Sequence, residues 1–157
     1  LFDYKHSCSF YCNRGTSGID GSTSTAVGAS VKSSSPVLLI TGDLSFFYDS
    51  NGLWNNYLKS NFRIIVINNN GGGIFKILPG YKNNIISSKF IETKHNLSTK
   101  HLAKMYGFDY LKARNEIGLK WSLYNFFSKS SKPKILEIKT NSDLSSELLK
   151  KYFINLK

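Results

Sequence analysis

Two continuous apolar runs, "PVLLI" at 36–40 and "IIVI" at 64–67, constrain the fold of this 157-residue chain more than any other feature. Each run is too short for a buried helix and suits a strand that is covered on both faces. A helix-length segment separates them, so the chain has room to cross over between two parallel strands. The pattern therefore predicts a three-layer α/β fold, with a mostly parallel sheet and helices on both of its faces.

The same alternation of short apolar runs and longer helical patterns continues along the rest of the chain. An irregular polar stretch from about 79 to 97 is long enough to form a functional loop or lid. Beyond it, Ser98 can cap a helix that ends at Gly107. The expected strands are 9–13, 36–42, 62–68, 108–113 and 133–140, and the expected helices are 18–33, 44–58, 98–106, 117–124 and 144–153.

Three of the expected helices carry an apolar stripe, which we interpret as the side that packs inward. Gly52 weakens the middle of the helix at 44–58. The stripes are Leu44, Phe47, Tyr48, Trp54 and Leu58 in the second helix, Ile117, Trp121 and Tyr124 in the fourth, and Leu144, Leu148, Leu149, Tyr152 and Phe153 in the last.

The composition fits one domain, residues 1–157, with a single hydrophobic core. Lys and Arg outnumber Asp and Glu by 21 to 10, which gives a formal net charge of +11. The basic residues are scattered, without a basic helix or an aromatic RNA-binding signature. We therefore interpret them as a solvated surface in preference to a nucleic-acid site.

The first residues, "LFDYKHSCSF", contain neither an initiator Met nor a charged and then apolar leader. We interpret the chain as a piece of a longer protein without an export signal. Its apolar runs are far shorter than a bilayer-crossing helix, so we expect no membrane segment and a cytoplasmic location. Cys8 and Cys12 would lie roughly 13 Å apart in an extended segment, which favours free thiols. Zinc would need more ligands than this pair and His6.

Three Gly-rich turns follow the first three expected strands. They are "NRGTSGIDGS" at 13–22, "GDLS" at 42–45 and "NNNGGGIF" at 68–75. Ligands of open parallel sheets bind beyond the carboxyl ends of the strands, so all three turns should lie on the ligand-binding rim. The first turn lacks the glycine spacing of a dinucleotide fingerprint, and a nicotinamide site is not expected.

Asp43 and Asn69 place oxygen ligands in two neighbouring turns. Mg²⁺ prefers such hard ligands and usually keeps phosphates and water in its shell. The glycines at 71–73 let the backbone approach phosphate groups, and the helix that begins near Leu44 or Ser45 offers free amide donors. Alone, Asp43 would be a helix N-cap and "NNNGGG" a flexible turn. Their pairing favours a site for a magnesium ion and a diphosphate.

A Gly-Asp turn followed about one strand-helix-strand unit later by Asn-Asn resembles the thiamin diphosphate motif. Within that superfamily, the chain resembles the family of 2-succinyl-5-enolpyruvyl-6-hydroxy-3-cyclohexene-1-carboxylate (SEPHCHC) synthases of menaquinone biosynthesis. The resemblance lies in "NRGTSGIDGSTSTAVG", "TGDLSFFYDSNGLW" and "INNNGGGIFKILPG" and covers nearly the whole chain. Leu44 stands where most thiamin enzymes have a second Gly, and this departure agrees with the family.

The resemblance implies a role for each matching residue. Mg²⁺, or Mn²⁺ in its place, would be bound by Asp43, the Asn69 side chain and the Gly71 carbonyl, together with the diphosphate. Arg14 would face the substrate carboxylates, for which a planar guanidinium is suited, unless it forms a surface ion pair. The implied cofactor-binding residues are Gly42, Asp43, Leu44, Ser45, Asn69, Gly71, Gly72, Ile74 and Phe75, and the implied substrate-binding residues are Arg14, Ile74, Phe75 and Leu78.

Some positions keep a second interpretation. Ile74, Phe75 and Leu78 could belong to a helix that packs onto the sheet, an alternative that is strongest for Leu78. His95 and His101 match no motif, and we assign them to the surface or to a structural role.

The resemblance also implies a reaction and partners. The reaction is a decarboxylating carboligation of 2-oxoglutarate to isochorismate, in which thiamin diphosphate performs the difficult chemistry. The activating glutamate would come from a pyrimidine-binding domain of a partner subunit, in a homodimer or homotetramer. No catalytic residue is therefore expected in this chain, a C-terminal fragment that would be inactive alone. The alternatives are another thiamin-dependent 2-oxo acid decarboxylase or synthase, and a noncatalytic anion- or nucleic-acid-binding domain.

Overall fold

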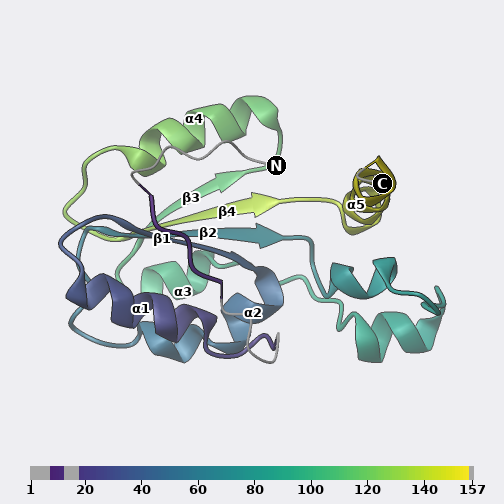
Figure 1. Ribbon diagram of the computed structural model, residues 1–157. Helices are drawn as coiled ribbons and strands as arrows, with labels where there is room; N and C mark the ends of the chain where they lie inside the picture. The colour runs from purple at the N-terminus through teal and green to yellow at the C-terminus, as the bar shows by residue number, and fades with distance from the viewer. Residues whose placement is uncertain (1–7, 13–17, 156–157) are drawn as a thin grey trace.

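The computed structural model describes residues 8–12 and 18–155, which form a sheet with helices on both faces (Figure 1). All strand pairs in the sheet are parallel, and the strand order is β1-β2-β4-β3. The prediction of a three-layer α/β fold is confirmed. The strands of the described residues are β1 (Val37–Gly42), β2 (Phe62–Asn68), β3 (Asp109–Ala113) and β4 (Lys134–Lys139).

Helices cover the two faces of the sheet unequally (Figure 1). Helices α1 (Ser22–Lys32), α2 (Asp43–Tyr48) and α3 (Lys100–Met105) lie on one face, and α4 (Glu116–Phe127) lies on the other. The last helix, α5 (Ser142–Asn155), lies beyond the carboxyl ends of the strands, where it contacts the 3₁₀ helix η2 (Gly73–Ile77). The turns at 42–45 and 68–75, which follow β1 and β2, thus share one rim of the sheet, as predicted, whereas part of the predicted turn at 13–22 lies outside the described residues.

Alternation along the central strands divides the core into two apolar clusters, because successive side chains of a strand point to opposite faces. On β2, Ile64 and Val66 belong to one cluster and Ile65 to the other. The first cluster contains Val27, Phe46, Leu53, Phe62, Ile64, Val66, Ala103, Phe108 and Ile135, and the second contains Ile65, Ala113, Phe126 and Leu136. The clusters attach α1, α2 and α3 to one face and α4 to the other.

The predicted strand at 9–13 is wrong over the residues that the structure describes. Residues 8–12 have no regular secondary structure and are exposed, and both edge strands of the sheet lack a pairing with them. Phe10 and Tyr11 are both largely exposed, so this segment does not bury the apolar side chains that a strand of the core would contribute. Cys8 and Cys12 are exposed free thiols, as expected.

The predicted helix at 44–58 is shorter than expected, and only part of its predicted stripe packs inward. Helix α2 begins at Asp43 and ends at Tyr48, and the 3₁₀ helix η1 (Ser50–Leu53) follows it. Gly52 lies against α1, where an added Cβ would be 2.6 Å from Ser24 Oγ. Phe46 and Leu53 are buried in the core, with Phe47 and Leu58 packed against it, whereas Tyr48 and Trp54 are exposed.

The apolar stripes predicted for the last two helices are also largely exposed. On α4, the side chains of Ile117, Trp121 and Tyr124 point away from the sheet, and Phe126 is buried against it. Helix α4 is apolar on more than one side, so the spacing of its apolar residues alone did not identify the side that packs against the sheet. On α5, the exposed members of the predicted stripe are Leu144, Leu148, Tyr152 and Phe153.

Other expectations hold more closely. Gly107 ends α3 with a positive φ of 76°, as predicted for a helix stop. The stretch at 79–97 is less irregular than predicted, since Ser87–Ile91 form one π-helical turn. Among the described residues, no helix has the length and apolar character needed to span a bilayer.

Candidate diphosphate and metal site

Asp43 lies where β1 gives way to α2, and its side chain is only 3% exposed. Its Oδ1 accepts a hydrogen bond from the backbone N–H of Leu44 at 2.8 Å. Its Oδ2 accepts one from the backbone N–H of Gly71 at 3.0 Å. The carboxylate therefore joins the turn after β1 to the turn after β2, and these are the two turns that the sequence pairs.

The Asn69 side chain points to the same place. One terminal atom of its amide lies close to both the Gly71 carbonyl oxygen, at 2.6 Å, and Asp43 Oδ2, at 3.3 Å. As an NH₂ group, this atom donates to both oxygens. Turned by 180°, the amide places Oδ1 there instead, and three oxygens then repel one another unless a cation lies among them.

The spacing of these three groups suits Mg²⁺. In an octahedral Mg²⁺ site with bonds of 2.0–2.1 Å, neighbouring ligand atoms lie about 3 Å apart. The two distances from the Asn69 amide atom, 2.6 and 3.3 Å, lie on either side of this value. Within 8–12 and 18–155, no three His, Cys, Asp or Glu side chains gather into a metal cluster. A donor set of one carboxylate, one amide and one backbone carbonyl fits a hard cation that keeps phosphate or water in its remaining positions.

The backbone of the turn after β2 is unusual at the positions that present these oxygens. Asn70 adopts a left-handed conformation, with φ of 66°, and Gly71 has φ of 148°. A Cβ at Gly71 would lie 2.7 Å from the carbonyl oxygen of Glu92. Glycine at 71 is therefore required both by its conformation and by the close approach of the neighbouring loop.

The stretch at 79–97 packs onto this turn through its backbone. The N–H of Gly72 donates to the carbonyl oxygen of Glu92 at 2.7 Å, and the N–H of His95 donates to that of Asn70 at 3.2 Å. The Lys76 ammonium lies between the Glu92 carboxylate, at 3.4 Å, and the Asp143 carboxylate, at 2.5 Å. The hydrogen bond from Lys76 is the main cause that lowers the pKa of Asp143. The expected loop is thus attached to the site by several contacts.

His95, which the sequence reading left without a role, faces the Asp43 carboxylate. Its Nε2 lies 3.3 Å from Asp43 Oδ2, in a position that does not satisfy hydrogen-bond geometry. Its Nδ1 accepts the N–H of Leu97 at 3.1 Å, so in the neutral ring Nε2 carries the proton. The Phe47 ring packs edge-on against the imidazole. The polar tip of His95 therefore points to the proposed metal ligand.

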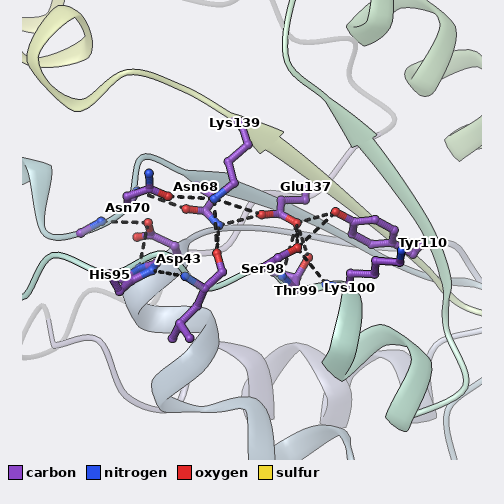
Figure 2. A network of polar contacts seen from close by, with 12 residues as sticks. Asp43, Asn68, Asn70, His95, Ser98, Thr99, Lys100, Tyr110, Glu137 and Lys139 are labelled. Carbon is purple, nitrogen blue, oxygen red and sulfur yellow. Dashed lines mark hydrogen bonds and ion pairs between the residues drawn. The ribbon is translucent and has the colours of Figure 1, made fainter.

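A second residue that the sequence reading missed is Glu137, which is fully buried in the middle of β4. Figure 2 shows its contacts in one row, from Tyr110 through Glu137 and Asn68 to Asn70, with Asp43 and His95 beside them. Glu137 Oε1 accepts from Asn68 Nδ2 at 2.7 Å. Oε2 accepts from the Tyr110 hydroxyl at 2.5 Å, and also from Ser98 Oγ, Thr99 N and Thr99 Oγ1.

These contacts shift the pKa values of both acids in the pair. Burial alone would raise the pKa of Glu137, but hydrogen bonds from Tyr110, Ser98 and Asn68 and the charge of Lys139 outweigh it, so the pKa lies below its usual range. Burial and the hydrogen bond to Glu137 raise the pKa of Tyr110 to about 12. Glu137 is accordingly an anion, and Tyr110 remains a donor to it at neutral pH.

The lowered pKa of Glu137 predicts part of the acid sensitivity of the fold. A carboxyl whose pKa falls on folding stabilises the native state above its unfolded pKa of about 4.3, and that contribution is lost as the pH falls through the folded pKa. Between about pH 5 and pH 3, the free energy of unfolding should therefore fall less steeply in Glu137→Gln than in the unmodified protein. Urea unfolding at several pH values measures the slopes.

Glu116 provides the control for this prediction, because its carboxylate is exposed on α4 in an i,i+4 pair with Lys120. Glu116→Gln should keep the pH slope of the unmodified protein, since exposed pairs contribute little. Equal slopes for Glu137→Gln and Glu116→Gln would show that the Glu137 carboxylate does not cause the loss of stability at low pH.

The other predicted site residues lie around the Asp43 carboxylate with different degrees of exposure. Gly42 ends β1 and is exposed, and Gly72 is buried beneath the 79–97 stretch. Ser45 Oγ donates to the Ile19 carbonyl oxygen and lies 3.0 Å from Ser22 Oγ, so it also joins α2 to the segment before α1. Arg14 lies outside the described residues.

The three apolar positions predicted to contact cofactor or substrate lie in η2 and just after it. Ile74 and Leu78 are exposed and outside both core clusters, whereas Phe75 is partly buried. The alternative in which a helix packs these side chains onto the sheet does not describe Ile74 and Leu78.

Comparison with known proteins agrees with the fold. A family model described as "Thiamine pyrophosphate enzyme, C-terminal TPP binding domain" matches residues 1–138. The chain belongs to this family, whose cofactor, thiamine pyrophosphate, is thiamin diphosphate under another name.

Individual relatives narrow the comparison to one kind of synthase. The chain is 60% identical over 153 residues to the SEPHCHC synthase of Christiangramia forsetii. This alignment covers 98% of this chain and 26% of the relative. The chain is 52% identical over 156 residues to the SEPHCHC synthase of Flavobacterium psychrophilum. This alignment covers 99% of this chain and 28% of the relative. The chain thus spans about a quarter of the length of the curated relatives that it matches.

Proposed function

We propose that this chain is the diphosphate- and metal-binding domain of a SEPHCHC synthase, a thiamin diphosphate-dependent transferase of menaquinone biosynthesis. The observation that carries the proposal is the convergence of Asp43, Asn69 and the Gly71 carbonyl, in a chain that belongs to the thiamine pyrophosphate family. The similarity to synthases of that name supports the particular activity. Small, dissolved acid substrates suit an enzyme that works in the cytoplasm.

In this proposal, the residues of the chain bind the cofactor, and the cofactor forms and breaks the bonds of the substrates. Asp43, the Asn69 amide and the Gly71 carbonyl would hold Mg²⁺, or Mn²⁺, and the ion would neutralise the diphosphate. Gly42, Leu44, Ser45 and Gly72 would lie along the phosphates. When bound, thiamin diphosphate supplies the carbanion chemistry that joins decarboxylation to carbon–carbon bond formation.

The proposed substrates are 2-oxoglutarate, which loses carbon dioxide, and isochorismate, which accepts the remaining carbon unit. Both are anions, and the net charge of +11 would favour their approach. Arg14 would bind a substrate carboxylate through its guanidinium. The exposed side chains of Ile74 and Leu78, with Phe75, would form the apolar side of the substrate site.

The proposal also assigns this chain to half of an active site. A pyrimidine-binding domain in a partner subunit of a homodimer or homotetramer would supply the activating glutamate. The chain spans about a quarter of its curated relatives, which leaves length for such a domain. Carboligation by the purified 157-residue chain alone would contradict this division.

Thermal unfolding with and without cofactor tests the proposal. A ligand that binds only the folded state stabilises it by RT ln(1 + L/Kd), where L is the free ligand concentration, so the melting temperature rises with the ligand concentration. We expect thiamin diphosphate to raise it in the presence of Mg²⁺, and the rise to disappear with EDTA. Thiamin without its diphosphate, added with Mg²⁺, should have no such effect. A rise that persists in EDTA, or no rise in both this chain and the full-length protein, would contradict the proposed site.

A further inference from the structure

We propose that Glu137 is a positioning residue for the metal site, because it holds the turn that presents Asn69 and Gly71. This inference rests on the proposed function, since it gives the turn a cation to bind. Glu137 itself is on β4, and its carboxylate lies behind the turn without forming part of the three-oxygen group (Figure 2). Its effect would have to pass through other side chains.

The first connection runs through Asn68. The groups in hydrogen-bond contact with the Glu137 carboxylate are donors, so the Asn68 amide must turn its NH₂ toward it. That orientation leaves Asn68 Oδ1 free to accept the backbone N–H of Asn70 at 3.1 Å. The same NH₂ also donates to the Leu97 carbonyl oxygen, which ties the 79–97 stretch to the turn.

A second connection runs through Lys139. Its Nζ lies 3.4 Å from Glu137 Oε1 and donates to Asn70 Oδ1 at 2.8 Å. Both connections therefore end on Asn70, one at its backbone and one at its side chain. Asn70, whose φ is 66°, lies between Asn69 and Gly71, two of the three proposed ligands. Asn adopts this left-handed conformation more readily than most other residues, and the contacts to its backbone and its side chain favour it here.

Asn70 and Glu137 therefore have different roles at the metal site. Asn70 sets the direction in which the chain leaves β2, which brings the Asn69 side chain and the Gly71 carbonyl to one point beside Asp43. Glu137 fixes Asn70 from behind. Groups that orient metal ligands in this way change metal affinity by about 10- to 100-fold when they are removed.

The test is Glu137→Gln, which keeps the shape and removes the charge. A glutamine that offers its carbonyl oxygen to Tyr110 and Ser98 presents its NH₂ to Asn68. The Asn68 amide would then reverse and place its own NH₂ against the N–H of Asn70. We expect the Mg²⁺ dissociation constant, measured by calorimetry with thiamin diphosphate present, to rise about tenfold or more. Without any ligand, hydrogen exchange at the Asn70 and Gly71 amides should become about tenfold faster.

Tyr110→Phe is the matched control, because it removes a donor from the opposite carboxylate oxygen, Oε2. It should lower stability while leaving Mg²⁺ affinity within about twofold and both exchange rates unchanged. If Glu137→Gln does not fold, Asn68→Ala interrupts the same connection and should reproduce the effects. In the double variant of Asn68 and Glu137, the two effects should not add.

Two readouts keep this inference distinct from the proposed function. Normal Mg²⁺ affinity and unchanged exchange in Glu137→Gln, with a protein that binds Mg²⁺, would overturn the positioning role and leave the proposed function intact. A protein that binds no Mg²⁺ in any form would remove the metal site, and the exchange rates would then decide whether Glu137 holds the turn. Equal losses in Glu137→Gln and Tyr110→Phe would indicate general destabilisation and would also overturn the inference.

Discussion

Replacing Asp43 by asparagine is expected to lower Mg²⁺ affinity, measured with thiamin diphosphate present, by about a hundredfold or more. Asp43 supplies the only charge among the three proposed ligands, whose other members are an amide and a backbone carbonyl. An amide at 43 would also place an NH₂ either at the position of Oδ2, toward the cation and the N–H of Gly71, or at the position of Oδ1, toward the N–H of Leu44. Calorimetric titration of Mg²⁺, in parallel with the cofactor-dependent melting shift, measures the effect.

Asp49 offers a closely matched control for this substitution. It is also a buried carboxylate, and it follows α2 directly. Its two oxygens accept the N–H and the hydroxyl of Ser24 on α1, at 2.7 and 2.6 Å, and contact none of the proposed ligands. Asp49→Asn should therefore lower stability by about 1–3 kcal/mol without changing Mg²⁺ affinity. Equal losses of affinity in both variants would argue against a metal at Asp43.

The second large effect is expected for Phe46→Ala, which should lower the free energy of unfolding by about 3–5 kcal/mol. The Phe46 side chain is fully buried between α2 and the sheet, in the cluster that includes Ile64 and Val66. Removing it loses the transfer free energy of the ring and leaves a cavity that the surrounding strands can fill only partly. Denaturant unfolding measures the difference.

Tyr48 is the control on the same helix, because two thirds of its side chain is exposed. Tyr48→Ala should change stability by less than about 0.5 kcal/mol. The pair also tests the corrected face of α2, since the sequence analysis placed Tyr48 inward and did not include Phe46 in the stripe. A larger loss from Tyr48→Ala than from Phe46→Ala would favour the original interpretation.

The sequence predicted the architecture well because its main signals are local. Continuous apolar runs mark β1 and β2, and Gly107 marks the end of α3 through its backbone freedom. The proximity of the turns at Asp43 and Asn69 follows from the parallel order of β1 and β2. Each of these features needs only neighbouring residues and the geometry of a crossover.

Features that depend on distant residues were not predictable in the same way. Glu137 lies 69 positions from Asn68, and nothing in "KILEIK" shows that its carboxylate will be buried among donors. His95 reaches Asp43 only because its loop folds back onto the Gly-rich turn. The inward face of α4 was misread because several of its sides are apolar, and spacing alone does not say which one packs.

The position of β4 has a consequence for how the domain assembles during translation. In the described sheet, β3 pairs with β4 and not with β1 or β2, although β4 is made last. A nascent chain that has released residues as far as Ala113 from the ribosome can pair β1 with β2 but leaves β3 without a neighbour. Only when β4 emerges is the sheet completed, and only then can Glu137 reach Asn68. The turn after β2 therefore gains these contacts only after β4 has emerged, so a translation product that stops before β4 would lack the hydrogen bond that holds Asn68 in place.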